Sequence, residues 1–347
     1  MVTLPKTGYE ESLEKTVVSK EKCMSCGACV VTCPFSCLEY DREKPKLVKK
    51  CEKCGICARV CPCYEWQQSA MEKFVFGRER KPEETYGVYR YVTIAQALDK
   101  EIREKCQDGG LVTALLKYTM EKGTIDSAVV SGLTLGKPFL PCPVVATSTA
   151  ELLACAGTRY TYSPNLLALK EAMKQKKKSL AYVGTPCQIQ AIRRMQMTSL
   201  KRYVEPVKLT IGLMCTECFA YNGLIRHIER TLGITSSDIA KMNIKGQLLV
   251  MMKSGEMKTV PLKEVKQFTR RECQSCTDFS SELAAISAGG LGMTDWTFVI
   301  VRTKVGEEVL KEAEEAEVIT TKPAEYERSA SDLLVKLSAK KRKRLGI

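Results

Sequence analysis

Two short cysteine runs constrain this chain more than any other feature of its sequence. Each run has the spacing Cys-x2-Cys-x2-Cys-x3-Cys-Pro, and the two runs span Cys23–Pro34 and Cys51–Pro62. In this pattern the first three thiolates wrap one cubane [4Fe–4S] cluster, and the fourth, held before proline, ligates the other cluster of the pair. The spacing therefore predicts a small α+β domain of the bacterial two-cluster ferredoxin type over residues 21–65.

Each predicted cluster takes three cysteines from one run and one cysteine from the other. The ligands expected for the first cluster are Cys23, Cys26, Cys29 and Cys61, and those for the second are Cys51, Cys54, Cys57 and Cys33. Gly27 and Gly55 lie between the second and third cysteines of their runs. A residue without a side chain at this point lets the backbone pass close to the cluster.

The rest of the composition excludes several classes of protein. The 347 residues include 18 cysteines in tight groups, which suit metal ligation in a reducing compartment, but only one histidine, His227. A histidine-containing zinc site, a Cys/His pair and a Ser/His/Asp triad are therefore poorly supported. No apolar run reaches the roughly 18 residues of a membrane span, and Met1–Lys15 lacks the apolar core of a secretory signal. We expect a cytoplasmic protein without a transmembrane segment.

The net charge of +14 predicts an anionic ligand or an acidic docking surface, because an excess of positive charge attracts both. Nucleic acid is a third candidate, but we expect no nucleic-acid partner, since no predicted helix interleaves basic and aromatic residues. The chain ends in a basic tail, residues 339–347. This tail is either solvated or a docking element for an acidic partner or a membrane surface.

Hydrophobic periodicity divides the remainder of the chain. We expect a polar leader at residues 1–20, a linker at 66–90 and a larger domain at 91–338. In this domain the patterns predict strands at 127–131, 179–184, 207–214 and 296–302, helices at 111–121, 165–177, 186–195, 223–232 and 306–317, and a hairpin at 242–260 that turns at Ser254-Gly255. Alternation of strands and helices predicts an α/β fold with a mixed, largely parallel sheet.

Four further cysteines stand where predicted elements end. Cys187 follows the strand 179–184, Cys215 follows the strand 207–214, and Cys273 and Cys276 form a third Cys-x-x-Cys pair. Because the ends of parallel strands converge on one edge of a sheet, these thiols are candidates for a third cluster. A zinc or redox pair at Cys273 and Cys276, with Cys187 as a buried packing residue, is the alternative.

Several segments of the larger domain, taken in order, resemble the beta subunits of coenzyme F420-dependent hydrogenases and dehydrogenases. These are Cys106–Gly110, Ala156–Pro164, Gly184–Gln188, Arg271–Phe279 and Trp296–Arg302. The resemblance covers roughly residues 85–345. With a ferredoxin module in front, the chain is most similar to the electron-input subunits of archaeal F420H2 dehydrogenase.

The resemblance implies a flavoprotein that exchanges hydride with coenzyme F420 and holds FAD beside one [4Fe–4S] cluster. The implied ligands of that cluster are Cys187, Cys215, Cys273 and Cys276, with Cys218 competing with Cys215. Candidate contacts to FAD or F420 are Gly109, Gly110, Thr113, Thr158, Arg159, Tyr160, Ser163, Asn165, Gly184, Thr185, Pro186 and Gln188. Amides at the helix entry 109–110 are expected to face a pyrophosphate, with an ordinary helix-entry turn as the alternative. No catalytic side chain is assigned, because hydride transfer between flavin-like rings depends mainly on positioning.

The implied activity is oxidation of reduced F420 through FAD, followed by transfer of single electrons through three clusters. The acceptor would be a membrane-bound quinone- or phenazine-reducing complex or a soluble ferredoxin. Two alternatives remain: an F420-reducing beta subunit of a hydrogenase or formate dehydrogenase, and a flavin-free electron-transfer adaptor.

Overall fold

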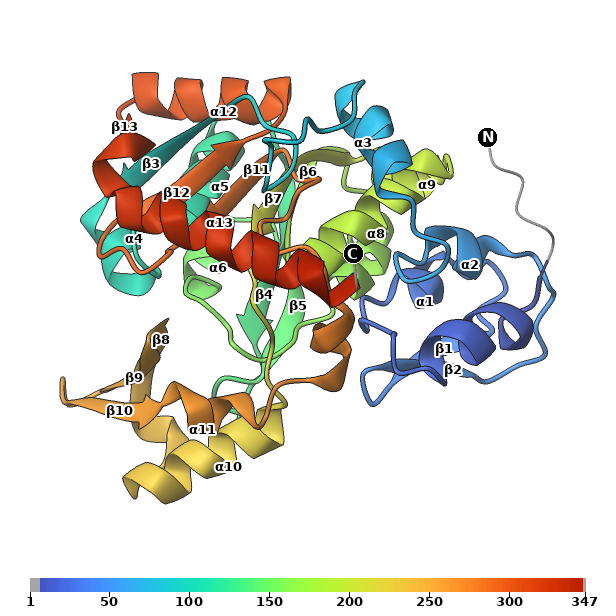
Figure 1. The fold of residues 1–347 in the computed structure, drawn as a ribbon, viewed down its shortest axis with the longest axis horizontal. Helices are drawn as coiled ribbons and strands as arrows, with labels where there is room; N and C mark the ends of the chain where they lie inside the picture. The colour runs from blue at the N-terminus through green and yellow to red at the C-terminus, as the bar shows by residue number, and fades with distance from the viewer. Residues whose placement is uncertain (1–6, 346–347) are drawn as a thin grey trace.

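The computed structural model describes residues 7–345 of the chain. Within these residues the larger domain is built on an eight-stranded sheet with the order β13-β3-β12-β11-β7-β6-β4-β5 (Figure 1). The strands are β3 (Tyr91–Ala97), β4 (Ser127–Leu133), β5 (Pro141–Ala146), β6 (Leu180–Gly184), β7 (Val207–Leu213), β11 (Ile286–Gly289), β12 (Thr297–Val301) and β13 (Ile319–Pro323). The predicted α/β class and the mixed sheet are confirmed.

Parallel pairing joins the four central strands β4, β6, β7 and β11. The pairs β4–β5, β11–β12, β12–β3 and β3–β13 are antiparallel. The expectation of a largely parallel sheet is therefore wrong. The short connections at 134–140 and 290–296 return the chain beside the strand it has just left, and such a connection produces an antiparallel pair.

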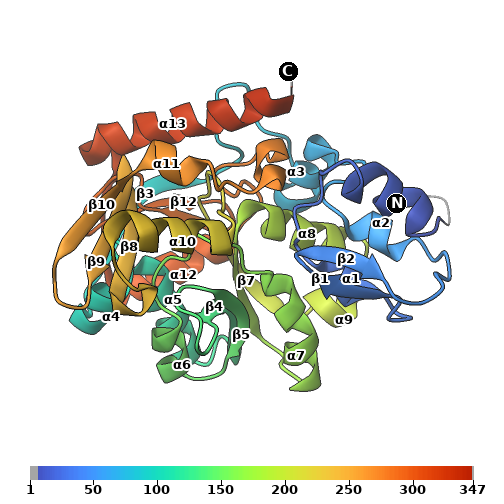
Figure 2. The same cartoon turned by 90° about the horizontal axis from the view of Figure 1, so that it is seen from below.

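Helices cover both faces of the sheet (Figures 1 and 2). Successive side chains of a strand point to opposite faces, so that in β4 Ala128 and Val130 enter one core and Val129 enters the other. The first core packs against α4 (Lys100–Lys105), α5 (Leu111–Glu121), α6 (Thr149–Ala154) and α12 (Lys304–Glu315). The opposite face packs against α7 (Ala168–Lys174), α8 (Pro186–Met197), α9 (Lys201–Val204) and α13 (Arg328–Arg342).

A second sheet lies at one end of the larger domain (Figure 1). It contains β8 (Ile239–Lys245), β9 (Gln247–Met252) and β10 (Met257–Pro261), all antiparallel, and it packs with α10 (Tyr221–Leu232) and α11 (Leu262–Lys266). The predicted hairpin 242–260 is present as β9 and β10, which turn at Ser254-Gly255. The structure adds β8 as a third strand. The remaining predicted helices and strands agree with the structure within a few residues, except that the helix expected at 165–177 opens with a 3-10 turn (Asn165–Leu167) and ends at Lys174.

The N-terminal module holds α1 (Ala28–Thr32), α2 (Ile56–Val60) and the hairpin β1 (Leu38–Asp41) and β2 (Lys44–Leu47). A π-helix, η1 (Glu10–Val18), buries Leu13 and Val17 in the core of this module. Residues 10–18 are thus part of the module and do not form the expected polar leader, because two apolar side chains a turn apart are enough to dock them. Residues 1–6 of that leader lie outside the described residues.

The stretch expected to be a linker is also structured. Helix α3 (Gln68–Phe76) buries Met71 in the core that contains α8. Charged residues of the same stretch are used in buried ion pairs, described below, which explains why a charge-rich sequence here is not a solvated linker. Among residues 7–345, no helix has both the length and the apolar composition that crossing a membrane would require.

Candidate functional site

Thiols from three separate segments line one cavity of the larger domain. It is named the third cavity, after the third cluster that the sequence predicts there. Its lining includes Cys187, Cys215, Cys218, Cys273 and Cys276, and its empty volume is about 340 Å³. The two β-strands that lead to it, β6 and β7, are parallel neighbours. Their carboxyl ends therefore open on the same edge of the sheet, as the sequence pattern predicted.

Local structure fixes the entry to this cavity. Thr185 caps α8 through a capping box with Gln188, and Pro186 occupies the first turn, where a missing N–H costs nothing. This start of α8 brings Thr185, Pro186 and Cys187 to the cavity wall. On the other side, the Cys215 N–H donates to the Phe279 carbonyl at 2.9 Å and so ties the end of β7 to the loop after Cys276.

The third cavity is apolar around its thiols but carries two buried cations, Arg270 and Lys341. Burial raises the pKa of the Cys187 thiol to about 12. Hydrogen bonding from Cys218, with Arg270 and Lys341 nearby, lowers the pKa of Cys273. The Lys341 ammonium lies 3.2 Å from the Cys276 sulfur, so residue 341 of the basic tail belongs to the cavity wall and is not solvated, contrary to one of the two interpretations of the tail. Residues 346 and 347 lie outside the described part of the chain.

Both candidates for the fourth ligand reach this cavity. Cys215 and Cys218 line it together, and the Cys218 N–H donates to the Cys273 sulfur at 3.4 Å. Five thiols thus surround a space in which a cubane cluster needs four. The choice of Cys215 over Cys218 stays a prediction.

The ferredoxin module brings its cysteines together in two further groups. The first group is Cys23, Cys26, Cys29 and Cys61: all four are buried, and Cys23, Cys29 and Cys61 pack in one cluster. The second group is Cys33, Cys51, Cys54 and Cys57, which line a cavity with an empty volume of about 320 Å³. Cys37 also lines this cavity, but its thiol donates to the Lys50 carbonyl at 3.2 Å. Each group contains the four cysteines that the spacing predicted for one cluster.

Backbone amides point at sulfur atoms of the second group. The Tyr9 N–H donates to the Cys51 sulfur at 3.4 Å, and the Cys37 N–H donates to the Cys33 sulfur at 3.3 Å. Such N–H···S bonds stabilise thiolates. Across residues 7–345, no three Cys, His, Asp or Glu side chains converge closely enough to hold one metal ion. The donor chemistry of the three groups, four or more thiols around a space, fits a polynuclear cluster better than a single zinc ion.

The three thiol groups follow one another through the molecule. Met24, between two cysteines of the first group, lines the third cavity. Met24 packs there against Cys187 and Cys218, while Cys23, Cys29 and Cys61 of the first group pack in one buried cluster with Cys57 of the second group. The first group therefore lies between the third cavity and the second group.

Arg270 joins the module to the larger domain at this junction. Its guanidinium donates to the Ser25 hydroxyl at 2.6 Å and to the Glu43 carboxylate at 2.8 Å, and it stacks over the Tyr162 ring at 4.2 Å. The side chain is 5% exposed. A residue from the larger domain thus fixes the loop that carries Met24.

A separate polar cluster lies where the loop before α5 meets β8. Lys241 donates to the Cys106 carbonyl, while Lys245 pairs with Asp108 at 3.4 Å. Asn243, between the two lysines, accepts from the Tyr160 hydroxyl at 3.2 Å. Nearby buried atoms have no partner within the described residues: both amide ends of Gln107 and the Nε of Arg159. Burial lowers the pKa of Arg159. Unpaired donors and several cations fit an anionic, nucleotide-like ligand.

Comparison with known proteins bears on both sites. Family models described as coenzyme F420 hydrogenase/dehydrogenase, beta subunit, match residues 92–170 with their N-terminal part and residues 177–327 with their C-terminal part. The chain is 40% identical to the beta subunit of coenzyme F420 hydrogenase from Methanothermobacter thermautotrophicus over 264 residues, which is 74% of this chain and 93% of that protein. The chain belongs to the family of coenzyme F420 hydrogenase/dehydrogenase beta subunits.

Another relative in this family and one solved structure agree. The chain is 37% identical to a component of the F420H2 dehydrogenase of Methanosarcina mazei over 204 residues, 58% of this chain and 57% of that protein. In the F420-reducing [NiFe] hydrogenase complex from Methanosarcina barkeri, one chain matches with a TM-score of 0.72 and 36% identity, covering 76% of this chain and 92% of that one. A 4Fe-4S binding domain model matches residues 16–39, which contain the first cysteine run.

The predicted cofactor contacts do not gather at one place. Thr185 and Pro186 line the third cavity, and Arg159 and Tyr160 border the polar cluster. Ser163, Asn165 and Gln188 hydrogen-bond to one another and to the Val183 carbonyl. The Thr113 hydroxyl accepts from the Cys106 thiol at 3.0 Å, and Thr158 is exposed.

Tight packing accounts for the predicted glycines. A Cβ on Gly109 would lie 2.6 Å from the Ala95 carbonyl oxygen, and one on Gly184 would lie 2.7 Å from the Tyr182 ring. Gly110 caps α5 with a φ of +71°, and its N–H donates to the Gln107 carbonyl at 3.3 Å. These contacts favour the helix-entry turn over a direct pyrophosphate contact for the Gly110 amide.

Several site residues were missed by sequence reasoning. Lys241, Asn243 and Lys245 had a signal, because residues two apart on a strand share a face and all three are polar. Arg270 and Lys341 had none, since nothing local distinguishes them from other basic residues. Their places depend on which distant segments they meet.

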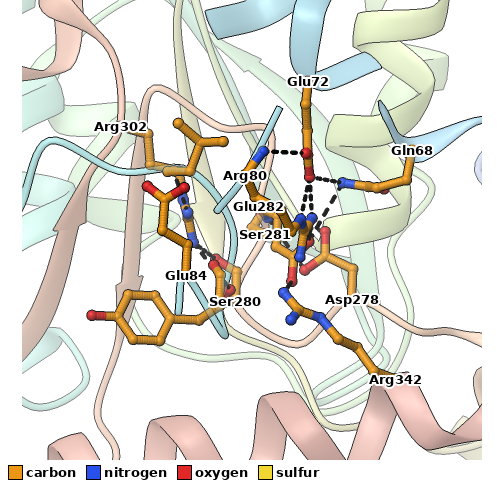
Figure 3. A network of polar contacts seen from close by, with 12 residues as sticks. Gln68, Glu72, Arg80, Glu84, Asp278, Ser280, Ser281, Glu282, Arg302 and Arg342 are labelled. Carbon is orange, nitrogen blue, oxygen red and sulfur yellow. Dashed lines mark hydrogen bonds and ion pairs between the residues drawn. The ribbon is translucent and has the colours of Figure 1, made fainter. Parts of the chain in front are cut away.

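A buried ion-pair network supports the loop after Cys276 (Figure 3). Glu282 lies between Arg80, from the stretch after α3, and Arg342, from the end of α13, which donates to it at 2.6 Å. Arg80 also pairs with Glu72 of α3. The network thus fastens residues 72–80 and the C-terminal helix to the segment that carries the third Cys-x-x-Cys pair.

Proposed function

We propose that this protein oxidises reduced coenzyme F420 by hydride transfer to bound FAD and passes the electrons singly through three [4Fe–4S] clusters to a partner protein. The observation that carries this proposal is the row of three thiol groups running from the third cavity to the edge of the N-terminal module. Such a row suits stepwise transfer of single electrons. Membership of the F420 hydrogenase/dehydrogenase family supplies the substrate of the proposal.

We assign the first two clusters as the cysteine spacing predicted and the third as the resemblance to the family implies. Cys23, Cys26, Cys29 and Cys61 would hold the first cluster, Cys51, Cys54, Cys57 and Cys33 the second, and Cys187, Cys273, Cys276 and either Cys215 or Cys218 the third. The electron route would run from the third cluster through the first to the second. Met24 and Arg270 support this order, because both connect the loop of the first cluster to the third cavity.

The second cluster is the proposed exit. Cys33, Cys51 and Cys54 are only partly buried, whereas Cys23, Cys26 and Cys29 are buried. Phe35, which also lines the cavity of the second group, is 50% exposed. An exposed aromatic beside a partly exposed cluster suits the docking of another protein.

The polar cluster is the proposed nucleotide side of the site. Lys241, Lys245 and Arg159 supply positive charge, and Gln107 supplies an unpaired donor and acceptor for FAD or the anionic tail of F420. Tyr160, at this cluster, is two residues from Tyr162 at the third cavity, so a ring held between them would stand close to the third cluster. When bound, FAD would accept the hydride and release its two electrons one at a time, with the accompanying protons passing to solvent.

A second function within the family has specific support. Hydrogenase beta subunits match 74% of the chain, whereas the F420H2 dehydrogenase component matches 58%. An F420-reducing subunit of a hydrogenase or formate dehydrogenase, with electrons entering through the N-terminal module, therefore fits as well as the oxidising direction. A cytoplasmic location suits both. The flavin-free adaptor is the weaker alternative, because it leaves Gln107 and Arg159 without a role.

Anaerobic analysis of iron, sulfide and flavin tests the proposal. We expect about twelve irons per chain, four for each cluster, and one FAD released on denaturation. Cys187→Ala should lower the iron to about eight and stop reduction of the module by reduced F420, while Arg159→Ala should weaken FAD or F420 binding. About eight irons and no flavin in the unaltered protein would refute the proposal and leave the adaptor.

Direction and partner are tested separately. Reduced F420 is followed by its absorbance while the protein is mixed with a membrane-bound quinone- or phenazine-reducing complex, with ferredoxin, or with hydrogenase or formate dehydrogenase subunits. Oxidation of F420 with the first two favours the dehydrogenase function. Reduction of F420 by hydrogen or formate favours the alternative.

A further inference from the structure

The last turn of α13 forms one wall of the third cavity. Lys341 lies there with 3% of its surface exposed, and its ammonium donates to the Cys276 sulfur at 3.2 Å and to the Asp278 carbonyl at 3.0 Å. The neighbouring basic residues Lys340 and Lys343 are exposed. Only one lysine of this basic run is thus turned towards the thiols.

Contacts on both sides hold Lys341 in this position. The Arg344 guanidinium donates to the Cys273 carbonyl at 2.6 Å, and Arg342 pairs with Glu282 at 2.6 Å (Figure 3). These two ties attach the helix end to the beginning and the end of the loop that carries Cys273 and Cys276. They therefore hold the last turn of α13, and Lys341 with it, against the cavity.

The charge of Lys341 has no carboxylate partner at ion-pair distance within residues 7–345. A buried ammonium is costly unless an anion lies beside it. Its hydrogen-bond partners are a thiol sulfur and a neutral carbonyl, and the Asp278 carboxylate acts on it only from beyond ion-pair distance. A cluster ligated by four thiolates carries net negative charge, and would supply the missing anion at the Cys276 sulfur.

We propose that Lys341 is a built-in counter-charge of the third cluster, a positioning residue that raises the reduction potential of this cluster. The inference rests on the proposed function, because it requires a cluster in the third cavity. Reduction adds one electron to the cluster and neither makes nor breaks a bond, so a fixed positive charge favours the reduced form. An N–H···S bond to a ligand acts in the same direction.

Potentiometric titration of the anaerobically purified full-length protein, followed by electron paramagnetic resonance, tests this. In Lys341→Met we expect one of the three clusters to titrate at a lower potential. At a fixed potential its ratio of reduced to oxidised cluster should fall at least tenfold, which is about 59 mV for one electron. The other two clusters should be unchanged, and Lys341→Arg should restore the potential.

Lys340→Met is the matched control. It removes the same charge one residue away on the same helix, but from an exposed position where solvent and salt screen it. Lys341→Gln, which removes the charge but keeps an N–H donor, serves if Lys341→Met fails to assemble the cluster, and it should also lower the potential. In each variant, iron and sulfide are counted before titration.

Three results would overturn the inference: an unchanged potential in Lys341→Met or Lys341→Gln protein with full iron, an equal shift in Lys340→Met, or no restoration in Lys341→Arg. These are distinct from failure of the proposed function, which would appear as about eight irons in the unaltered protein.

Discussion

Arg270 offers the sharpest test of how the two parts of the chain are coupled. We consider Arg270→Met, which keeps much of the side-chain volume but removes the guanidinium. The change leaves the Ser25 hydroxyl, only 1% exposed, without its partner. Loss of a buried hydrogen bond to a charged group costs about 1.5–3 kcal/mol.

Two further contacts set the size of the effect. Stacking of the guanidinium on the Tyr162 ring is worth up to about 2 kcal/mol when desolvated, and methionine recovers part of it by packing on the ring. The pair with Glu43 adds less than about 1 kcal/mol, because that carboxylate is 46% exposed and can hydrate. We expect the loop around Met24 to open more easily by about 3 kcal/mol, which is roughly a hundredfold in the opening equilibrium.

Hydrogen–deuterium exchange of the holoprotein measures this opening at the amides of residues 23–26 and 270–276. Arg271→Met is the control. Arg271 is adjacent and also bridges to the module, through Glu21, but both side chains are largely exposed, so we expect less than about 0.5 kcal/mol. Equal exchange in the two variants would refute the reasoning, as would an effect of Arg270→Met confined to residues far from this junction.

Three further predictions concern the support of the sites. Glu282→Gln removes the carboxylate between Arg80 and Arg342 and should lower the free energy of unfolding by about 3 kcal/mol. Glu307→Gln, whose partners Arg90 and Lys311 are at the surface, should have a much smaller effect; similar melting temperatures in the two variants would contradict this. Gly27→Ala should lower iron occupancy of the module, because its φ is +83° and a Cβ would lie 2.8 Å from Leu167, whereas Gly77→Ala, with a φ of +73° and no atom within 4 Å, should leave iron content unchanged. Arg302→Lys should lower the melting temperature by several degrees, because lysine cannot reproduce the hydrogen bonds of the buried guanidinium to Ser287, Val88 and Ser280. Arg90→Lys, at an exposed position, is the control. A smaller loss in Arg302→Lys than in Arg90→Lys would contradict a structural role for the Arg302 guanidinium.

Much of the larger domain was predictable because its signals are local. The apolar periodicities of residues 111–121 and 186–195 begin directly after the capping residues Gly110 and Thr185, and the helices α5 and α8 have nearly those bounds. The direction of strand pairing was less accessible. It depends on the path that a connection takes between two strands, and the sequence shows the length of a connection more readily than its path.

The linker was predicted wrongly, and the role of Lys341 in the basic tail was not predicted, for a different reason. Charged residues such as Glu72, Arg80 and Lys341 are typical of solvated segments, and burial was not expected for them. Glu72 and Lys341 are nevertheless buried and Arg80 is half-buried, because Glu282 lies opposite Arg80, Arg80 lies opposite Glu72, and Cys276 lies opposite Lys341. No local pattern reports such partners.

The sequence by itself determined which cysteines form two of the three thiol groups and that they suit [4Fe–4S] clusters. Each of the runs Cys23–Cys33 and Cys51–Cys61 supplies three closely spaced sulfurs for one cluster and a fourth for the other. The sequence also indicated that Cys187 and Cys215 stand at strand ends. Only the tertiary structure decided that Cys218 joins them, that Met24 and Arg270 connect the module to the third cavity, and that Lys341 closes it. Those contacts join residues up to about 250 positions apart, and at such separations packing of whole elements, rather than local spacing, determines which side chains meet.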